Sequence, residues 1–334
     1  MAKRIIIDCD PGNGVAGANV DDGLAIALAI ASPHISLELI TTVAGNTNRD
    51  VGYSVAKEIV NLMGLNIPVC KGASQALIEP SKQWRDYLDN NVKKKGLLHL
   101  WPEKPEVKTT DNSPINAAQA IGELVCQNSH QISVVAIGPL TNIAHVIQLY
   151  PDFAHAVQEI IIMGGVFNVE GYLKDTNFAI DPEAAHIVLN SGAKITLAPY
   201  DVTTTTMLKH EHLDAIELND NVLSQYIVKT TRPWMNYSMQ TRHIPGCWIH
   251  DVLCVAYLID PTIVTTNEYT VDIALQGDYT RGSSRKWKKN DIRLCVGMPP
   301  LPENMINIME TVDNSKLLSI IFEALEYSCQ NKIS

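Results

Sequence analysis

The chain has 334 residues, of which 46% are hydrophobic, and its mean hydropathy is +0.01. These values are typical of a soluble globular protein that is long enough to bury a large core. A net charge of −10 argues against a nucleic-acid-binding surface, and no apolar run approaches the ~20 residues of a membrane-spanning helix. The seven scattered cysteines indicate reduced thiols, and without a signal peptide after Met1 a cytoplasmic location is expected.

The chain begins with a predicted strand and helix. Residues 4–7 are a short run rich in isoleucine, which is typical of a strand buried on both faces. Residues 23–31 are small and apolar and predict a buried helix. Glycines and a proline between the two forbid regular structure there.

Two pairs of carboxylates lie at the junction of these elements. Asp8 and Asp10 end the strand, and Asp21 and Asp22 precede the helix. Aspartates at a buried strand end repel one another unless a cation or a proton intervenes, and hard oxygen ligands suit Ca²⁺ or Mg²⁺. The alternative is an acidic loop in which Asp22 is an ordinary helix cap.

The rest of the first 200 residues repeats a strand, a loop and a helix. The predicted strands are 35–43, 67–70, 132–137, 159–163 and 194–198. The predicted helices are 51–63, 113–129, one from the turn 138–142 to Tyr150, and 181–191. Between them, residues 71–112 show no periodicity and are expected to form a long functional or mobile loop.

The second half of the chain has a different character. It predicts a helix over 211–242 with a break near Pro233, a buried helix over 250–258, and a closing amphipathic helix over 317–327. Late strands are expected at 269–275 and 306–312.

This rhythm predicts an α/β fold with an open, mostly parallel central sheet covered by helices on both faces. Because no linker or repeat interrupts the chain, we expect a single domain over residues 1–334. Ligands of such sheets bind at the carboxyl ends of the strands. Polar residues are expected to meet there from Asp8 and Asp10, Asn46, the turn 137–142 and the loop after Met163.

Eight sequence blocks follow one another along nearly the whole chain: IIIDCDPG…DD, TTVAGNT, AIGPLTNIA, IIMGG, NFAIDPEAAH, YDVT, IHDVLCVAYL and GDYTRG. In this order they resemble the nucleoside hydrolase family, the inosine–uridine preferring group and its relatives. The resemblance implies Ca²⁺-dependent hydrolysis of the N-glycosidic bond of ribonucleosides to ribose and free base. It also implies a small-molecule substrate and self-association as a homodimer or homotetramer.

The resemblance assigns a metal site. Asp10, Asp22 and Asp251 are its expected carboxylate ligands, and the backbone carbonyl of Ile137 is its neutral ligand. Asp10 is also the expected general base, which takes a proton from a water that the Ca²⁺ holds. Cleavage of the C–N bond develops an oxocarbenium ion on the ribose, so such a water has an electrophile to attack.

The resemblance also implies a set of contacts around the nucleoside. The ribose is expected to contact Asp21, Asn46, Met163, Asp175 and Asn177. His250 is the candidate acid for the leaving base, so Asp10, His250 and Asn177 form the expected catalytic set. Taken outside the resemblance, these residues have structural alternatives: helix caps, turn residues and satisfied core side chains.

The sequence departs from the family pattern in three places. Eight residues, 13–20, separate the DPG motif from the second acidic pair where relatives have one, and we expect an extruded loop that leaves both pairs in place. Asp175-Thr176 stands where relatives have Glu-Phe, which leaves the preference for the 5′ group of the ribose open.

The third departure is that residues 71–112 lack a His-Gly-x-x-Gly segment. Instead, residues 80–85 resemble the loop of the purine-specific group, so Trp84 is expected to stack on the leaving base and favour purines; the alternative is a surface tryptophan.

Two other function classes remain open at this point. A phosphatase of the haloacid dehalogenase type also places an Asp-x-Asp after its first strand, although here Pro11-Gly12 follows the motif. A non-catalytic ribose- or metal-binding protein on the same fold is the second, because a fold does not fix a function.

Overall fold

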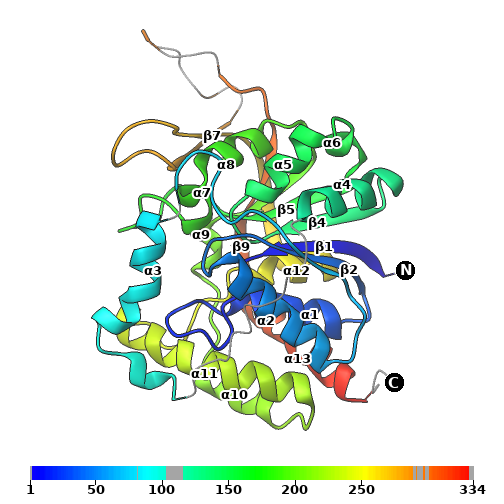
Figure 1. Cartoon of the computed structure of the whole chain (residues 1–334), viewed down its shortest axis with the longest axis vertical. Coiled ribbons are helices and arrows are strands. Elements are labelled where there is room, and N and C mark those ends of the chain that lie inside the picture. The colour runs from blue at the N-terminus through cyan, green and yellow to red at the C-terminus, as the bar shows by residue number, and fades with distance from the viewer. Residues whose placement is uncertain are drawn as a thin grey trace.

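The computed structural model describes residues 2–80, 82–102, 116–288, 291, 296–297 and 301–330. In that part of the chain, nine strands form one sheet in the order β3-β2-β1-β4-β5-β6-β9-β7-β8 (Figure 1). The strands are β1 Lys3–Cys9, β2 Ile35–Thr42, β3 Val69–Lys71, β4 Ile132–Ala136, β5 Glu159–Met163, β6 Ile195–Ala198, β7 Val264–Ile273, β8 Ser284–Trp287 and β9 Ile306–Val312. β7 and β8 are antiparallel to their neighbours, and the other pairings are parallel, so the predicted mostly parallel sheet is confirmed.

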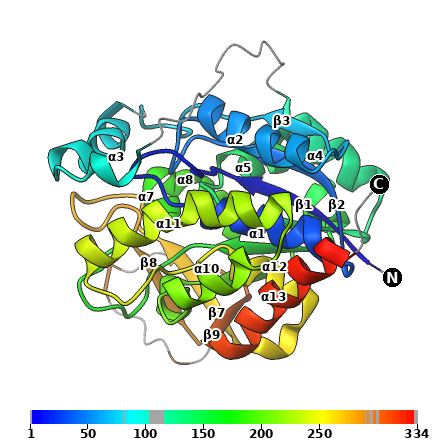
Figure 2. The ribbon, with the colours of Figure 1, turned by 90° about the horizontal axis from the view of Figure 1, so that it is seen from below.

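Helices cover both faces of this sheet (Figures 1 and 2). They are α1 Asp21–Ala31, α2 Arg49–Leu62, α3 Lys82–Lys94, α4 Ala117–Gln127, α5 Thr141–Leu149, α6 Phe153–Ala156, α7 Thr176–Ile180, α8 Pro182–Leu189, α9 Tyr200–Thr203, α10 His210–Glu217, α11 Val222–Arg242, α12 Val252–Ile259 and α13 Asn314–Gln330, with 3-10 turns η1 Leu98–Leu100 and η2 Pro261–Ile263. No helix in the described ranges is both long and apolar enough to cross a membrane.

The isoleucines of β1 explain why the sheet lies between two helical layers. Ile5 and Ile7 belong to the apolar cluster that contains residues of α1, α12 and α13, whereas Ile6 belongs to a second cluster that contains residues of α4, α5 and α8. All three side chains are fully buried. A strand with apolar residues on both faces requires cover on both faces, and the sequence supplies that cover from alternating helices.

Two predictions about helices were wrong. Residues 71–112 were expected to lack regular structure, yet α3 and η1 lie within them. The apolar residues of α3 are sparse, but Trp84, Leu88 and Val92 follow one another at intervals of four, and Val92 is buried against the chain at Gly17. Such a short stripe among charged residues is a weak signal of a helix.

The second wrong prediction was the break near Pro233. That residue lies inside α11, which continues through it. The helical region is interrupted instead between α10 and α11, where the Asn221 side chain accepts a hydrogen bond from the Ser224 backbone N–H at 2.8 Å and starts the second helix. Proline removes one backbone hydrogen bond, and the remaining bonds and the packing of α11 hold the helix together. The predicted start of a helix at Ser113 lies outside the described residues, and α4 begins at Ala117.

Candidate functional site

A pocket of about 300 Å³ opens at the carboxyl edge of the parallel strands. Four of its lining residues form what we call the acidic floor: Asp10, Asp21, Asp22 and Asp251. Asp10 follows β1, Asp21 and Asp22 begin α1, and Asp251 is the residue before α12. Three segments that are far apart in the sequence therefore deliver carboxylates to one place, as the sequence predicts for Asp10, Asp22 and Asp251.

The acidic floor is compact. One oxygen each of Asp21, Asp22 and Asp251 lies within 4.8 Å of the others. Asp10 is tied to this group because its backbone N–H donates to Asp22 Oδ1 at 2.9 Å. Each of the four side chains is buried, with at most 5% of its surface exposed.

Burial and mutual repulsion favour the protonated forms of these carboxyls. Desolvation raises the pKa of Asp10 and of Asp21 to about 6, and the positive charges of Arg85 and Arg242 oppose that rise at Asp10 and Asp21 respectively. For Asp22 and Asp251, desolvation and then the neighbouring carboxylates raise the pKa well above its ordinary value. Four converging oxygen donors that resist ionisation in the absence of a cation fit a hard divalent ion.

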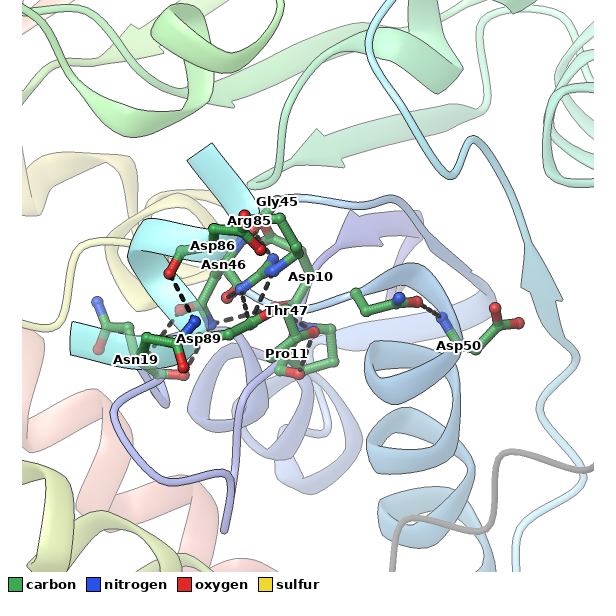
Figure 3. Close-up of polar contacts among 12 residues, drawn as sticks. Asp10, Pro11, Asn19, Gly45, Asn46, Thr47, Asp50, Arg85, Asp86 and Asp89 are labelled. Carbon is green, nitrogen blue, oxygen red and sulfur yellow. Dashed lines mark hydrogen bonds and ion pairs between the residues drawn. The ribbon is translucent and has the colours of Figure 1, made fainter. Parts of the chain in front are cut away.

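A turn after β2 holds Asp10 in place (Figure 3). The Asn46 backbone N–H donates to Asp10 Oδ2 at 2.5 Å, and its side-chain Nδ2 donates to the Asp10 carbonyl at 3.2 Å. The preceding residue must be glycine, since a Cβ on Gly45 would lie 1.8 Å from Asp10 Oδ2. Asn46 lines the pocket, and its side chain is directed toward Asp10 and the inserted loop.

The inserted residues 13–20 pack beside the floor and do not displace it. Asn46 fastens the end of this loop by exchanging hydrogen bonds of 2.9 Å with the backbone N–H and carbonyl of Asn19. At the start of the loop, Asn13 is buried and donates to Thr230 Oγ1 of α11 at 3.1 Å. The expectation that the loop leaves both acidic pairs in place agrees with the positions of Asp10, Asp21 and Asp22, but it is wrong for Asp8, which does not line the pocket. Asp8 points away from the pocket and accepts hydrogen bonds from other side chains.

Two further predicted ribose contacts, Met163 and Asn177, line the pocket together with Ile137. Asn177 Nδ2 donates to the carbonyl of Ile137 at 2.8 Å and to that of Met163 at 3.1 Å. All three residues line the pocket, and the Ile137 carbonyl retains a second lone pair for a ligand. Asp175 also lines the pocket, but its oxygens accept from the backbone N–H groups of Phe178 and Gly165, so Asp175 acts as the cap of α7.

His250 lies beside the floor as a neutral imidazole. Its ring stacks on Tyr200 at a centroid distance of 4.7 Å, and Nδ1 lies 2.7 Å from Thr203 Oγ1. Nε2 is buried and has no hydrogen-bond partner among the described residues. Desolvation and the charge of Arg242 lower the pKa of His250 to about 3.

Eight further lining residues form a helical wall that the sequence did not predict. The wall consists of Tyr87, Leu88, Asn91, Lys95, Trp234, Tyr237, Thr241 and Arg242, from α3, the residue after it, and α11. Trp84 is half-buried at the start of α3 and is not among the residues that line the pocket. The spacing of Tyr87, Asn91 and Lys95 at intervals of four could have revealed one face of a helix.

Comparisons with known proteins agree with this geometry. The family model described as inosine-uridine preferring nucleoside hydrolase matches residues 5–319. The chain is 29% identical over 331 residues to the pyrimidine-specific ribonucleoside hydrolase RihA of Salmonella typhimurium, and 30% identical over 333 residues to that of Citrobacter koseri. Both alignments cover 98% of this chain and 99% of the relative.

Solved structures show the same fold. A plant nucleoside hydrolase, PpNRh1, superposes with a TM-score of 0.83 at 26% identity, covering 98% of this chain and 99% of that one. The purine-preferring ribonucleoside hydrolase from Gardnerella vaginalis gives a TM-score of 0.79 at 26% identity, covering 99% and 100%. The phosphatase alternative is therefore wrong. The chain belongs to the inosine-uridine preferring nucleoside hydrolase family, and the family supports hydrolysis of the N-glycosidic bond of ribonucleosides.

Proposed function

We propose that this enzyme cleaves ribonucleosides with the help of one Ca²⁺ ion held by Asp10, Asp22, Asp251 and the Ile137 carbonyl. The observation that carries the proposal is the convergence of four buried carboxylates at the edge of the sheet. Asp21, whose carboxylate lies within the same cluster, binds the ribose hydroxyls together with Asn177. When bound, the ion supplies a positive charge that holds the ribose diol and a water and lowers the pKa of that water.

Asp10 acts as the general base. Its carboxylate takes the proton of the attacking water as the water oxygen bonds to C1′, and the electron pair of the broken C–N bond goes to the base nitrogen. Without an ion, burial raises the pKa of Asp10 to about 6, so its carboxylate is already largely ionised at neutral pH. The Asn46 backbone N–H fixes the orientation of the carboxylate.

His250 assists the leaving base as a neutral donor. If the Thr203 hydroxyl donates to Nδ1, the ring proton sits on the unpartnered Nε2, where it is available to a ring nitrogen or carbonyl of the base. Met163 packs beneath the ribose. Asp175 acts indirectly, because its carboxylate holds the Gly165 backbone N–H and caps the helix that carries Asn177.

Base preference is a separate part of the proposal. The relatives named above include pyrimidine-specific and purine-preferring enzymes, so similarity does not decide between the two. We propose that Trp84, which precedes the lining residues Tyr87 and Leu88 by about one turn of α3, contacts the leaving base and favours purines. A homodimer or homotetramer, a cytoplasmic location and a single domain remain further predictions.

The acidic floor predicts how stability depends on pH without metal. Burial raises the pKa of Asp10 and of Asp21 to about 6 in the folded protein, above the ordinary value of 3.8, so the native state binds more protons and its stability falls as the pH rises from 5 to 8. Asp8, whose pKa burial raises to about 7, adds to this fall, and His250 partly offsets it. We expect the free energy of unfolding, measured with urea in chelator, to fall by at least about 2 kcal/mol over that range.

The matched variant for this measurement is Asp22→Asn, which removes one repelling charge. It should show a shallower fall than the wild type, and saturating Ca²⁺ should flatten the fall in the wild type. His250 contributes a slope of the opposite sign in both proteins, so the difference between them isolates the carboxylates. Equal slopes in the two proteins would contradict the account.

Asp10→Asn tests the general base. We expect kcat for release of free ribose from inosine or uridine to fall about 10²- to 10⁴-fold, because amide oxygen cannot take the proton. Asp214→Asn, at an exposed ion pair on α10, is the control and should behave as the wild type. If the wild type binds ribonucleosides at saturating Ca²⁺ but releases no ribose from any purine or pyrimidine substrate, the non-catalytic alternative is correct.

Trp84→Ala tests base contact. The ratio of kcat/KM for inosine to that for uridine should fall about 3- to 10-fold, the effect of losing one aromatic stack, while Trp84→Phe should keep most of the ratio. If Trp84→Ala turns over both substrates at wild-type rates, Trp84 does not contact the leaving base.

A further inference from the structure

We infer that Arg85 is a positioning residue for Asp10, and that it acts through the peptide group between Gly45 and Asn46. The inference rests on the proposed function, because it takes Asp10 as the base. Arg85 belongs to the helix α3 that the sequence did not predict, and it does not line the pocket.

The contacts form a continuous chain (Figure 3). Arg85 Nη1 donates to the Gly45 carbonyl at 2.5 Å, and Nη2 donates to the Asn46 carbonyl at 2.9 Å. The Gly45 carbonyl and the Asn46 N–H are the two ends of one planar peptide group, and that N–H donates to Asp10 Oδ2 at 2.5 Å. Arg85 therefore holds one edge of the plane whose other edge holds the base.

This peptide needs such a support. Glycine permits wide rotation of the adjoining peptide group, and no other residue fits here, since a Cβ on Gly45 would strike Asp10 Oδ2. A charged donor on the carbonyl also polarises the group and strengthens the hydrogen bond from its N–H. Without Arg85, the plane is free to rotate and the Asn46 N–H loses its alignment with the carboxylate.

Neighbouring side chains fix the position of the Arg85 guanidinium. Asp89, one turn later on α3, pairs with it at 2.6 Å, and its guanidinium lies 5.5 Å from the centre of the Trp84 ring. The Arg85 side chain is 13% exposed, whereas that of Asp89 is 54% exposed. Because α3 also carries part of the helical wall, two effects must be separated: placement of the wall, which changes KM, and orientation of Asp10, which changes kcat.

The kinetic test compares Arg85→Ala and Arg85→Lys with the control Lys93→Ala, at an exposed position of the same helix that does not line the pocket. Arg85→Ala should lower kcat about 10- to 100-fold, the cost of a misplaced catalytic group, with a smaller change in KM. Arg85→Lys keeps the charge but loses the forked contact to two carbonyls, so it should lie between Arg85→Ala and the wild type. Lys93→Ala should keep the wild-type kcat. Millimolar guanidinium should restore activity to Arg85→Ala, and ammonium at equal ionic strength should not.

A spectroscopic readout follows the peptide directly. The Gly-Asn dipeptide occurs twice in the chain, at 12–13 and 45–46. Protein labelled with carbonyl ¹³C in glycine and ¹⁵N in asparagine therefore gives two carbonyl–amide cross-peaks. In Arg85→Ala the Asn46 amide proton should move upfield as its bond to the carboxylate weakens, guanidinium should reverse the shift, and the Asn13 signal should serve as the internal reference.

Failure of the Arg85 inference and failure of the proposed function give different results. An increase in KM at unchanged kcat in Arg85→Ala, or an Asn46 signal that stays in place in an active enzyme, would overturn this inference alone. Failure of the wild type to release ribose would contradict the proposed function instead.

Discussion

The repulsion among four buried carboxylates is the constraint on which the rest of the site depends. Asp10, Asp21, Asp22 and Asp251 are held out of water at one edge of a sheet, where ionisation of each opposes ionisation of the others. Parallel strands and the helices that follow them deliver these residues from three parts of the chain. Without a cation, the repulsion among these carboxylates lowers the stability of the fold. A bound cation would offset their negative charge and stabilise the folded state.

The hydrogen bonds that hold the acidic floor in place also connect the loops around it. Asn46 bonds to Asp10 on one side and to Asn19 on the other, so Asp10 and the inserted loop share one anchor. Arg85 adds α3 to that anchor through the backbone of the same turn. The helix that closes the pocket and the carboxylate at its floor are thus coupled through a single turn after β2 (Figure 3).

The two sides of the pocket differ in charge. The floor is acidic, whereas the helical wall carries Lys95 and Arg242, whose guanidinium lies 5.1 Å from the ring centre of Trp234 and 5.2 Å from that of Trp248. A nucleoside has a matching division between a hydroxylated sugar and an aromatic base. The floor suits the sugar, and the aromatic and cationic wall suits the base.

Local patterns predicted the sheet and the meeting of the two N-terminal acidic pairs, because buried isoleucine runs and strand ends followed by aspartate have a clear spatial meaning. That Asp251 joins them was expected only from the resemblance to the nucleoside hydrolase family. It did not predict the helical wall. The apolar stripe of α3 is short and charged residues surround it, and the pocket face of α11 was hidden by the expectation of a break at Pro233. The part of Asp175 as the cap of α7 could not be predicted either, since a carboxylate that caps a helix and one that binds a sugar have the same sequence.

Calorimetric titration of Ca²⁺ into chelator-stripped protein at pH 6, in two buffers of different ionisation enthalpy, tests the central claim most directly. The account predicts one ion per chain and release of about one proton or more on binding, because Asp10 and Asp21 titrate near that pH and must ionise to accommodate the ion. Asp22→Asn combined with Asp251→Asn should abolish this binding. An absence of saturable heat in the wild type, or equal binding by the double variant, would contradict the account.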